Sequence, residues 1–196
     1  MTEKPMSSPF DPIRFRFDES KAAAAAALLL KLEGGRMNYM RLIKLLYLAD
    51  RESLIRLGRP ISGDRFYAMK HGPVLSSVLD LIRRGMFQPV GAQGPWGSHI
   101  ERDGYAVRLK KDPGVSCLSE AEAQILTEAS RLCRSFDQWH LRDITHFLPE
   151  WHDPGNTSTE ILPEDILRAL EKPEEEIEEV RQEALEKAHF DSVFGS

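Results

Sequence analysis

The chain has 196 residues, of which 41% are hydrophobic and 29% are charged, a balance typical of a soluble globular protein. This length accommodates one domain with a sizeable core plus appendages. The formal net charge of −5 at pH 7 argues against a positive field over the whole molecule, although it leaves room for a local basic patch. The two cysteines form no metal-binding pattern, and no apolar run is long enough for a membrane span or a signal peptide. We therefore expect a protein of the reducing cytoplasm with no membrane partner.

Residues 1–17 contain three prolines and little periodicity, which predicts an N-terminal arm. Its spaced hydrophobic residues would let it dock as an extended strand: Phe10, Ile13, Phe15 and Phe17. Asp18 or Ser20 is the expected cap of a first helix, whose alanine run has high helix propensity and ends at Gly34 and Gly35. Since alanine permits close approach, this helix should pack against the next one.

The most apolar long segment, residues 38–57, predicts a helix at the centre of the fold. One broad face of this helix gathers its hydrophobic residues: Tyr39, Leu42, Ile43, Leu46, Ala49, Leu54 and Leu57. A stripe of that width is typical of a helix packed on more than one side. Gly58 is the expected left-handed stop, and the Arg59-Pro60 pair prevents continuation.

Asp50 interrupts this apolar stripe. A carboxylate in such a place needs a hydrogen-bond donor, because an unpaired buried charge is costly. We favour a structural role, with Arg65, Lys70 or turn amides as the partner. A catalytic acid or base is the alternative, which the lack of a second carboxylate at a useful spacing disfavours.

Residues 65–69 have the composition of a strand and are followed by Lys70-His71-Gly72-Pro73-Val74. Pro73 suits the first position of a second helix, which is expected to end at Gly85. Lys70 and His71 beside a helix N-terminus are able to hold an anion. An ordinary tight corner between strand and helix is the interpretation we favour.

Several of these segments resemble a known family. The sequences KLLYLAD at 44–50 and KHGPV at 70–74 look like the paired signature of the SocA-like antitoxin, or Panacea, domain. The sequence LSEAE at 118–122 and the Thr145-His146 pair are similar to its second half, so the resemblance spans residues 18–152. On this basis the structural motif residues are Lys44, Tyr47, Asp50, His146 and Trp151.

The resemblance implies an antitoxin-type binding domain from toxin–antitoxin loci and phage-related genes, without catalysis or a cofactor. The expected partner is a cognate toxin, neutralised by direct binding over roughly 1,600 Å² of total interface. Presentation of the toxin to a AAA+ protease is a second expectation. The candidate partner-binding residues are Lys70, His71, Gly72, Pro73 and Trp96.

DNA binding is the alternative function. A helix, a turn, a second helix and a hairpin resemble a winged helix-turn-helix in outline, and antitoxins often repress their own operons, so operator DNA is a further expected partner. Arg83-Arg84 and Lys110-Lys111 give modest local basicity. The helix expected at 74–84 is, however, poorly suited as a recognition helix for DNA bases, because it offers only Ser76, Ser77, Asp80 and Arg83.

Residues 85–97 are predicted to form a loop, rich in glycine and proline. Within it, Trp96 either folds back onto the core or is an exposed anchor for a partner. Residues 99–109 read as a hairpin with a type I′ turn at Asp103-Gly104. Together with residues 66–69, this hairpin is expected to form a small three-stranded antiparallel sheet.

Helices dominate the remainder. Ser119 and Glu122 predict a capping box, and a shorter helix at 138–148 should present Leu141, Ile144 and Leu148 inward. Pro163 is expected to start another helix. Residues 173–189 form an acidic helix with one narrow apolar stripe, which packs on the domain or mates with a partner.

The predicted class is therefore mainly α (α+β): a helical bundle with a small antiparallel sheet. We divide the chain into an arm at 1–17, a domain at 18–152 and a C-terminal helical extension at 153–196. His140, His146 and His152 are six residues apart, which places them on different helix faces and disfavours a metal site. With no phosphate loop or nucleophile motif either, an enzyme is the weaker class.

Overall fold

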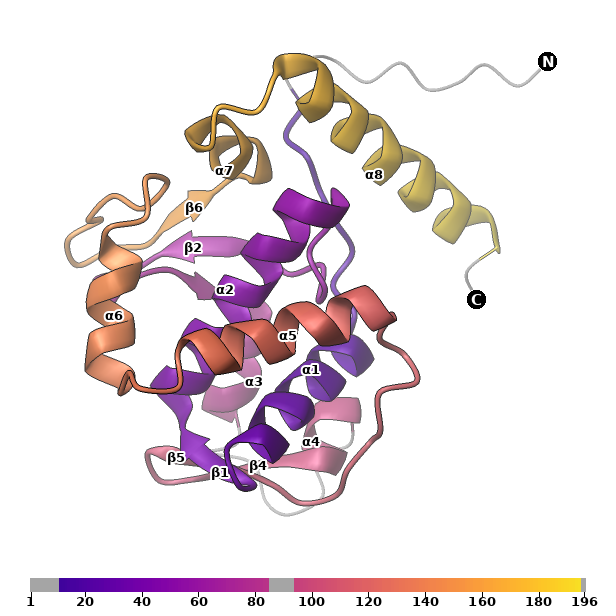
Figure 1. Ribbon diagram of the computed structural model, residues 1–196. Coiled ribbons are helices and arrows are strands. Elements are labelled where there is room, and N and C mark those ends of the chain that lie inside the picture. Colours follow the sequence, from indigo (N-terminus) through magenta and orange to yellow (C-terminus); the bar gives the residue numbers. More distant parts are fainter. Residues whose placement is uncertain (1–10, 85–93, 195–196) are drawn as a thin grey trace.

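The computed structural model describes residues 11–84 and 94–194 (Figure 1) and confirms a mainly helical α+β fold. Its helices are α1 (Glu19–Leu32), α2 (Tyr39–Leu57), α3 (Ser76–Arg84), α4 (Pro95–His99), α5 (Glu120–Leu132), α6 (Gln138–His146), α7 (Pro163–Ala169) and α8 (Glu174–Phe194). Its strands are β1 (Arg36–Asn38), β2 (Phe66–Ala68), β3 (Val74–Leu75), β4 (Ile100–Asp103), β5 (Ala106–Leu109) and β6 (Thr159–Ile161).

Helix α2 is the central element, as its wide apolar stripe predicts. The Asn38 side chain caps it by accepting a hydrogen bond from the Met40 amide at 2.8 Å, and Gly58 ends it in the left-handed region at φ 68°. The helix contacts α1, α5, α6 and β3. Because neighbours surround it, even polar residues of α2 are buried, among them Lys44 and Asp50.

Helix α1 confirms the reasoning from its alanine run. Asp18 caps it by accepting from the Lys21 amide at 3.0 Å, and all six alanines from Ala22 to Ala27 are buried. Their small side chains allow α1 to lie close to α2, α4 and α5. Gly34 and Gly35, both at positive φ, follow the end of the helix as expected.

The strands form two separate sheets, in the orders β1-β5-β4 and β3-β2-β6. The expected hairpin exists as β4 and β5, but its third strand is β1; the expectation that residues 66–69 would join it was wrong. The expected turn type was also wrong. Asp103 pairs with Ala106, so Gly104 and Tyr105 occupy the turn, and only Gly104 has positive φ, at 60°. Positive φ at the first turn residue alone is characteristic of a type II′ turn.

The second helix begins later than predicted, because its expected first residues belong to the second sheet. Val74 and Leu75 pair with β2 as strand β3, so α3 begins at Ser76, and Pro73 is not its first residue as expected. The Asp64 carboxylate accepts from the amides of Ser77 at 3.0 Å and Val78 at 2.9 Å. This carboxylate satisfies amides at the start of α3, where the helix itself offers them no acceptor. The predicted helix end at Gly85 lies outside the described residues.

Residues 153–194, which were expected to form a helical extension, also contain a strand. Strand β6 pairs antiparallel with β2, with Ile161 opposite Phe66, so a strand that follows residue 152 completes the β3-β2-β6 sheet. Helix α7 begins at Pro163 as predicted. Helix α8 buries one narrow side, formed by Ile177, Arg181 and Ala184, and therefore packs on the domain, one of its two expected roles.

Residues 11–17 dock against this C-terminal part in an extended conformation without forming a strand. Ile13 is buried, and its amide donates to the Glu164 carboxylate at 3.2 and 3.3 Å. Arg181 of α8 donates to the carbonyl of Asp11 and approaches Glu164 at 3.7 Å. One buried arginine thereby links the arm, α7 and α8; Phe10 lies outside the described residues.

Trp96 belongs to the core. It lies on α4, the short helix that replaces the end of the predicted loop, and its side chain packs in the core with 4% of the residue exposed. Its amide donates to Glu19 at 3.0 Å. The prediction of Trp96 as a partner-binding residue was therefore wrong, since a buried ring offers no surface to a partner. Predicted loop residues 85–93 lie outside the described part.

Candidate partner-binding site

The corner between β2 and β3 is built tightly around Gly72. Its φ is 84°, and its amide donates to the Met69 carbonyl at 2.9 Å. A Cβ at this position would lie 2.7 Å from Thr145 Oγ1 and 2.8 Å from Lys44 Nζ. Both the backbone conformation and the close neighbours therefore require glycine.

Lys44 holds this corner against α2. It is 1% exposed, and its Nζ donates to the Pro73 carbonyl at 2.7 Å. Burial, together with the charge of Arg142, lowers the pKa of Lys44 to about 7. No carboxylate forms an ion pair with Lys44 among the residues that the structure describes.

His146 and Trp151 close the corner from the other side. Their rings stack with centroids 4.1 Å apart and planes 10° apart, and the Trp151 indole donates to the Met69 carbonyl at 3.3 Å. Burial lowers the pKa of His146, with the charges of Lys44 and Arg142 acting in the same direction. Its Nε2 atom is buried without a hydrogen-bond partner, so this imidazole is fixed by packing.

A second contact ties α2 to the same segment. The Tyr47 hydroxyl donates to Glu150 at 2.9 Å, and Arg51 donates to the two carboxylate oxygens at 2.6 and 3.2 Å. Burial raises the pKa of Tyr47 well above its usual value, and the charge of Glu150 adds to this effect. Lys44 and Tyr47 thus hold the two halves of the expected motif together from one helix.

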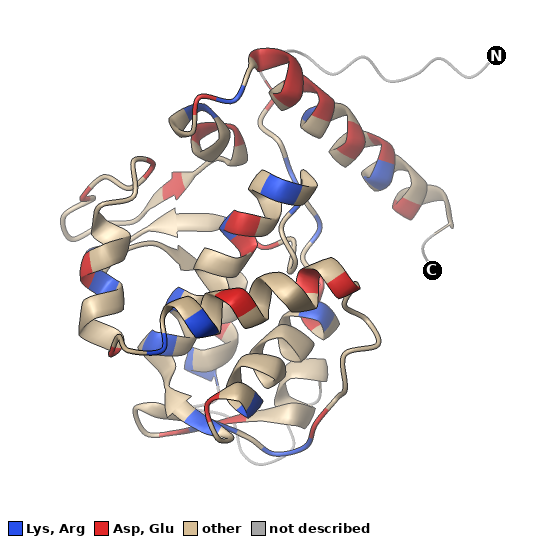
Figure 2. Cartoon of the chain, viewed as in Figure 1, with Lys and Arg blue, Asp and Glu red and all other residues tan. Residues whose placement is uncertain are grey.

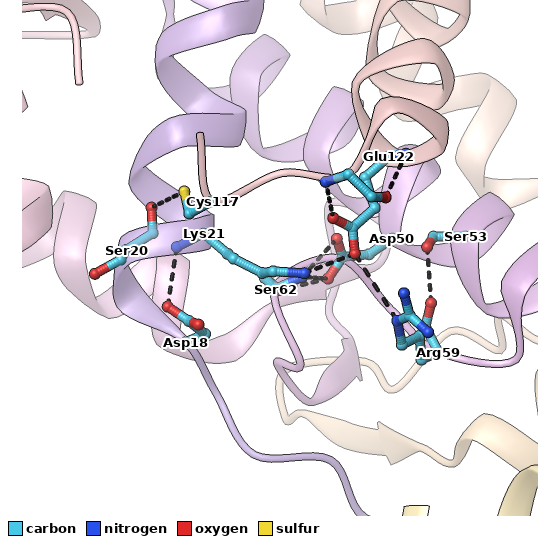
Figure 3. Close-up of polar contacts among 10 residues, drawn as sticks. Asp18, Ser20, Lys21, Asp50, Ser53, Arg59, Ser62, Cys117 and Glu122 are labelled. Atoms are coloured by element: carbon cyan, nitrogen blue, oxygen red, sulfur yellow. Dashed lines mark hydrogen bonds and ion pairs between the residues drawn. The ribbon is translucent and has the colours of Figure 1, made fainter. Parts of the chain in front are cut away.

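Asp50 lies in a different cluster (Figure 3). It accepts from the Ser62 amide at 3.2 Å and also from the Ser62 hydroxyl. Of the partners considered, the turn amides are therefore correct, and Arg65 and Lys70 are not. Burial raises the pKa of Asp50 to about 7 against the lowering effect of these hydrogen bonds, and the charge of Asp64 raises it further.

Glu122 of α5 lies beside this cluster and is also fully buried (Figure 3). It completes the predicted capping box by accepting from the Ser119 amide at 2.8 Å, and it pairs with Lys21 at 2.7 Å. Burial alone would raise the pKa of Glu122, but the hydrogen bonds from Lys21 and Ser119 outweigh it and leave the pKa lowered. These residues connect α1, α2 and α5, so their role is structural.

The outer side of the corner is exposed. Lys70 and His71 are exposed as a binding role requires, whereas Gly72 and Pro73 are buried and shape the backbone instead. Phe147, next to His146, is 88% exposed. We call Lys70, His71, Trp139, Arg142 and Phe147 the corner surface.

Trp139 and Arg142 extend the corner surface along α6. Trp139 is 48% exposed, and the Arg142 guanidinium lies over its ring at 5.2 Å from the centroid. Ile144, expected to face inward, is instead 38% exposed. The sequence reasoning missed Phe147; its place beside the Thr145-His146 pair was the available signal.

The comparison with protein families matches residues 42–152 to the family described as Antitoxin SocA-like, Panacea domain. The chain belongs to this family. The match begins at Leu42, within α2 and later than the predicted residue 18, and it includes the rest of α2, the Gly72 corner, α5, α6 and Trp151. Searches of curated proteins and of solved structures gave no match.

Two further findings concern the described residues of this Panacea protein. No group of three or more histidine, cysteine, aspartate or glutamate side chains among them is arranged to hold a metal ion. None of the helices they form has the length and apolar character needed to cross a membrane.

Proposed function

We propose that this chain neutralises a cognate toxin by binding it directly, with the corner surface as the contact and without chemistry of its own. The family supports an antitoxin, and the observation that carries the proposal is Phe147. A phenylalanine that is 88% exposed contributes little burial of apolar surface to the fold. It lies beside the residues that carry the family motif.

The chemistry of the corner surface supports the same role. Exposed aromatic and arginine side chains are enriched among the residues that contribute most to protein–protein binding. The backbone beneath them is held by Lys44, Gly72 and Trp151, so little ordering is needed on association. Binding over an interface of standard size, roughly 1,600 Å² in total, would cover a toxin active site by mass action.

The test uses the product of the adjacent open reading frame as the toxin. Co-expression of the full chain should restore growth, and the purified pair should bind. Phe147→Ala and Lys70→Ala should weaken binding, Phe147→Ala by about tenfold or more. Tyr105→Ala is the matched control, because Tyr105 is 78% exposed but lies in the hairpin turn. Equal affinity for Phe147→Ala and the control would remove the corner surface from the proposal.

Delivery of the toxin to a AAA+ protease would be a further activity of the same complex. It is tested by the half-life of the toxin in cells with and without the antitoxin. A half-life that shortens in its presence supports an adaptor role, and one that lengthens supports masking alone.

The geometry does not favour the DNA-binding alternative. Helices α2 and α3 are separated by residues 58–75, which include β2 and β3, whereas a helix-turn-helix has a turn of about three to four residues. The β4–β5 hairpin belongs to the other sheet. A mobility-shift assay with operator DNA over a range of salt concentrations would test this alternative directly.

A further inference from the structure

Helix α8 lies outside the family match and has two contrasting sides. Its inner side is buried at Ile177, Arg181 and Ala184, which anchor the helix to the arm and α7. Between Ala184 and Phe194 no further residue is buried. The last turns of α8 therefore extend beyond the part of the helix that packs on the domain.

The outer side carries an ordered stripe. Glu175, Glu179, Glu186, Phe190 and Val193 follow one another at spacings of four, seven, four and three residues, which place them along one face of an α-helix. The first three are acidic and the last two are apolar. Figure 2 shows how strongly acidic residues dominate α8. We call these five residues the outer stripe.

Four residues of the outer stripe contribute little to the stability of the fold: Glu175, Glu179, Phe190 and Val193. Glu175 and Glu179 are exposed and form no hydrogen bond or ion pair with the described residues. Like charges four residues apart on a helix are destabilising by a few tenths of a kcal/mol. Phe190 is 61% exposed and Val193 is 57% exposed. Phe190 makes its aromatic contact with Phe194, which is itself 69% exposed, at 4.9 Å between centroids.

We propose that the outer stripe is a second contact for the cognate toxin, and that it binds a basic surface bordering an apolar pocket. This rests on the proposed function. An amphipathic helix that lays a spaced row of side chains into a groove is a common mode of recognition. The glutamates would speed encounter with a basic partner, and Phe190 and Val193 would anchor the complex.

Charge complementarity favours the toxin over a second copy of this chain as the occupant. The chain has a formal net charge of −5, so self-association would bring an acidic row toward an acidic molecule. Juxtaposed like charges oppose association. A partner with a basic groove has no such cost.

The experiment measures association and dissociation rates of the full chain with the product of the adjacent reading frame. Phe190→Ala/Val193→Ala should weaken binding about tenfold or more, mainly through faster dissociation. Glu175→Gln/Glu179→Gln should slow association several-fold at low salt, and this effect should fade as salt increases. All four side chains are exposed, so circular dichroism should show an unchanged fold.

Two controls match these changes elsewhere on the molecule. Leu132→Ala removes an apolar side chain that is 65% exposed on α5. Asp80→Asn/Glu120→Gln changes the net charge by the same amount through two exposed acids of α3 and α5. Neither control should alter the toxin kinetics.

The outcomes separate this inference from the proposed function. If the wild type binds the toxin and Phe147→Ala weakens binding, while both α8 variants behave as wild type, the outer stripe is not a contact and the proposed function stands. If Phe190→Ala/Val193→Ala changes only the oligomeric state of the free chain, the stripe is a self-association surface and the inference is overturned. A wild type that does not bind the toxin removes both proposals.

Discussion

The Lys44 ammonium group lies 2.7 Å from the carbonyl oxygen of Pro73, 29 residues further along the chain, and this contact is buried. It joins the central helix to the corner that carries Lys70 and His71. The same lysine lies where a Cβ on Gly72 would have to go. Lys44 and Gly72 are therefore buried, whereas Lys70 and His71 of the same corner are exposed.

Gly72→Ala should destabilise the protein more than the same change at Gly104. At Gly72 the new Cβ meets Thr145 and Lys44 at 2.7 and 2.8 Å, in addition to a positive φ, whereas at Gly104 it meets nothing within 4 Å. Backbone strain alone costs about 1–3 kcal/mol, and the clash adds to it at Gly72. Urea denaturation of both variants checks this. Equal losses of unfolding free energy would show that the corner yields to accommodate the methyl group.

Lys44→Met should change how stability depends on pH above neutrality. The pKa of Lys44 is lowered from 10.5 to about 7, chiefly by burial, so between these values the unfolded chain binds more protons at this residue. The penalty for burying the charge is full below about pH 7 and disappears as pH rises toward 10.5. Wild-type stability should therefore rise relative to Lys44→Met by up to about 1.4 kcal/mol per pH unit in this window.

The measurement is the free energy of unfolding between pH 6.5 and about 9.5. Over this interval an ordinary lysine, as in the unfolded chain, stays mostly charged. Lys70→Met is the control, since it removes an exposed lysine from the same corner. A profile for Lys44→Met that runs parallel to wild type would mean that Lys44 keeps its proton in the fold.

Asp50→Asn should show the opposite trend in the acidic range. The pKa of Asp50 is raised from 3.8 to about 7, first by burial, so the folded chain binds more protons there than the unfolded chain. This contribution to stability is full below about pH 3.8 and is lost as pH rises through 7. The amide keeps an acceptor for the Ser62 donors and does not titrate.

Asp50→Asn should therefore gain stability relative to wild type from pH 4 to 7, by up to about 1.4 kcal/mol per pH unit. Thermal or urea unfolding across this range measures the gain. Asp80→Asn, at an exposed position, provides the reference. A difference between Asp50→Asn and wild type that stays constant with pH would place the Asp50 pKa near its ordinary value.

Two truncations should separate the parts of the C-terminal segment. A chain ending at Ala184 loses no buried residue of the described part, so its melting temperature should stay within a few degrees of wild type. A chain ending at His152 loses β6 and the buried residues Ile161, Ile166 and Leu167, and should not fold. Ile177→Ala, at a site that is 1% exposed, should cost about 2–5 kcal/mol. A stable fragment 1–152 would show that the family match folds without this segment.

The sequence by itself determined the features that depend on neighbouring residues. The limits of α2 follow from Asn38 and Gly58, the start of α5 from Ser119 and Glu122, and the burial of α1 from its alanines, because caps and periodicity act within a few residues. The KHGPV corner was found in the same way. The Gly72-Pro73 pair indicates a tight turn from the local sequence alone.

Only the tertiary structure decided which distant segments meet. Nothing local in Thr159–Ile161 indicates that it pairs with Phe66–Ala68, and nothing in Val74-Leu75 indicates a strand rather than the first turn of α3. The burial of Trp96 and the exposure of Phe147 were decided in the same way. Backbone pairing and burial depend on what the rest of the chain places alongside a residue, and that information is spread over segments more than 80 residues apart.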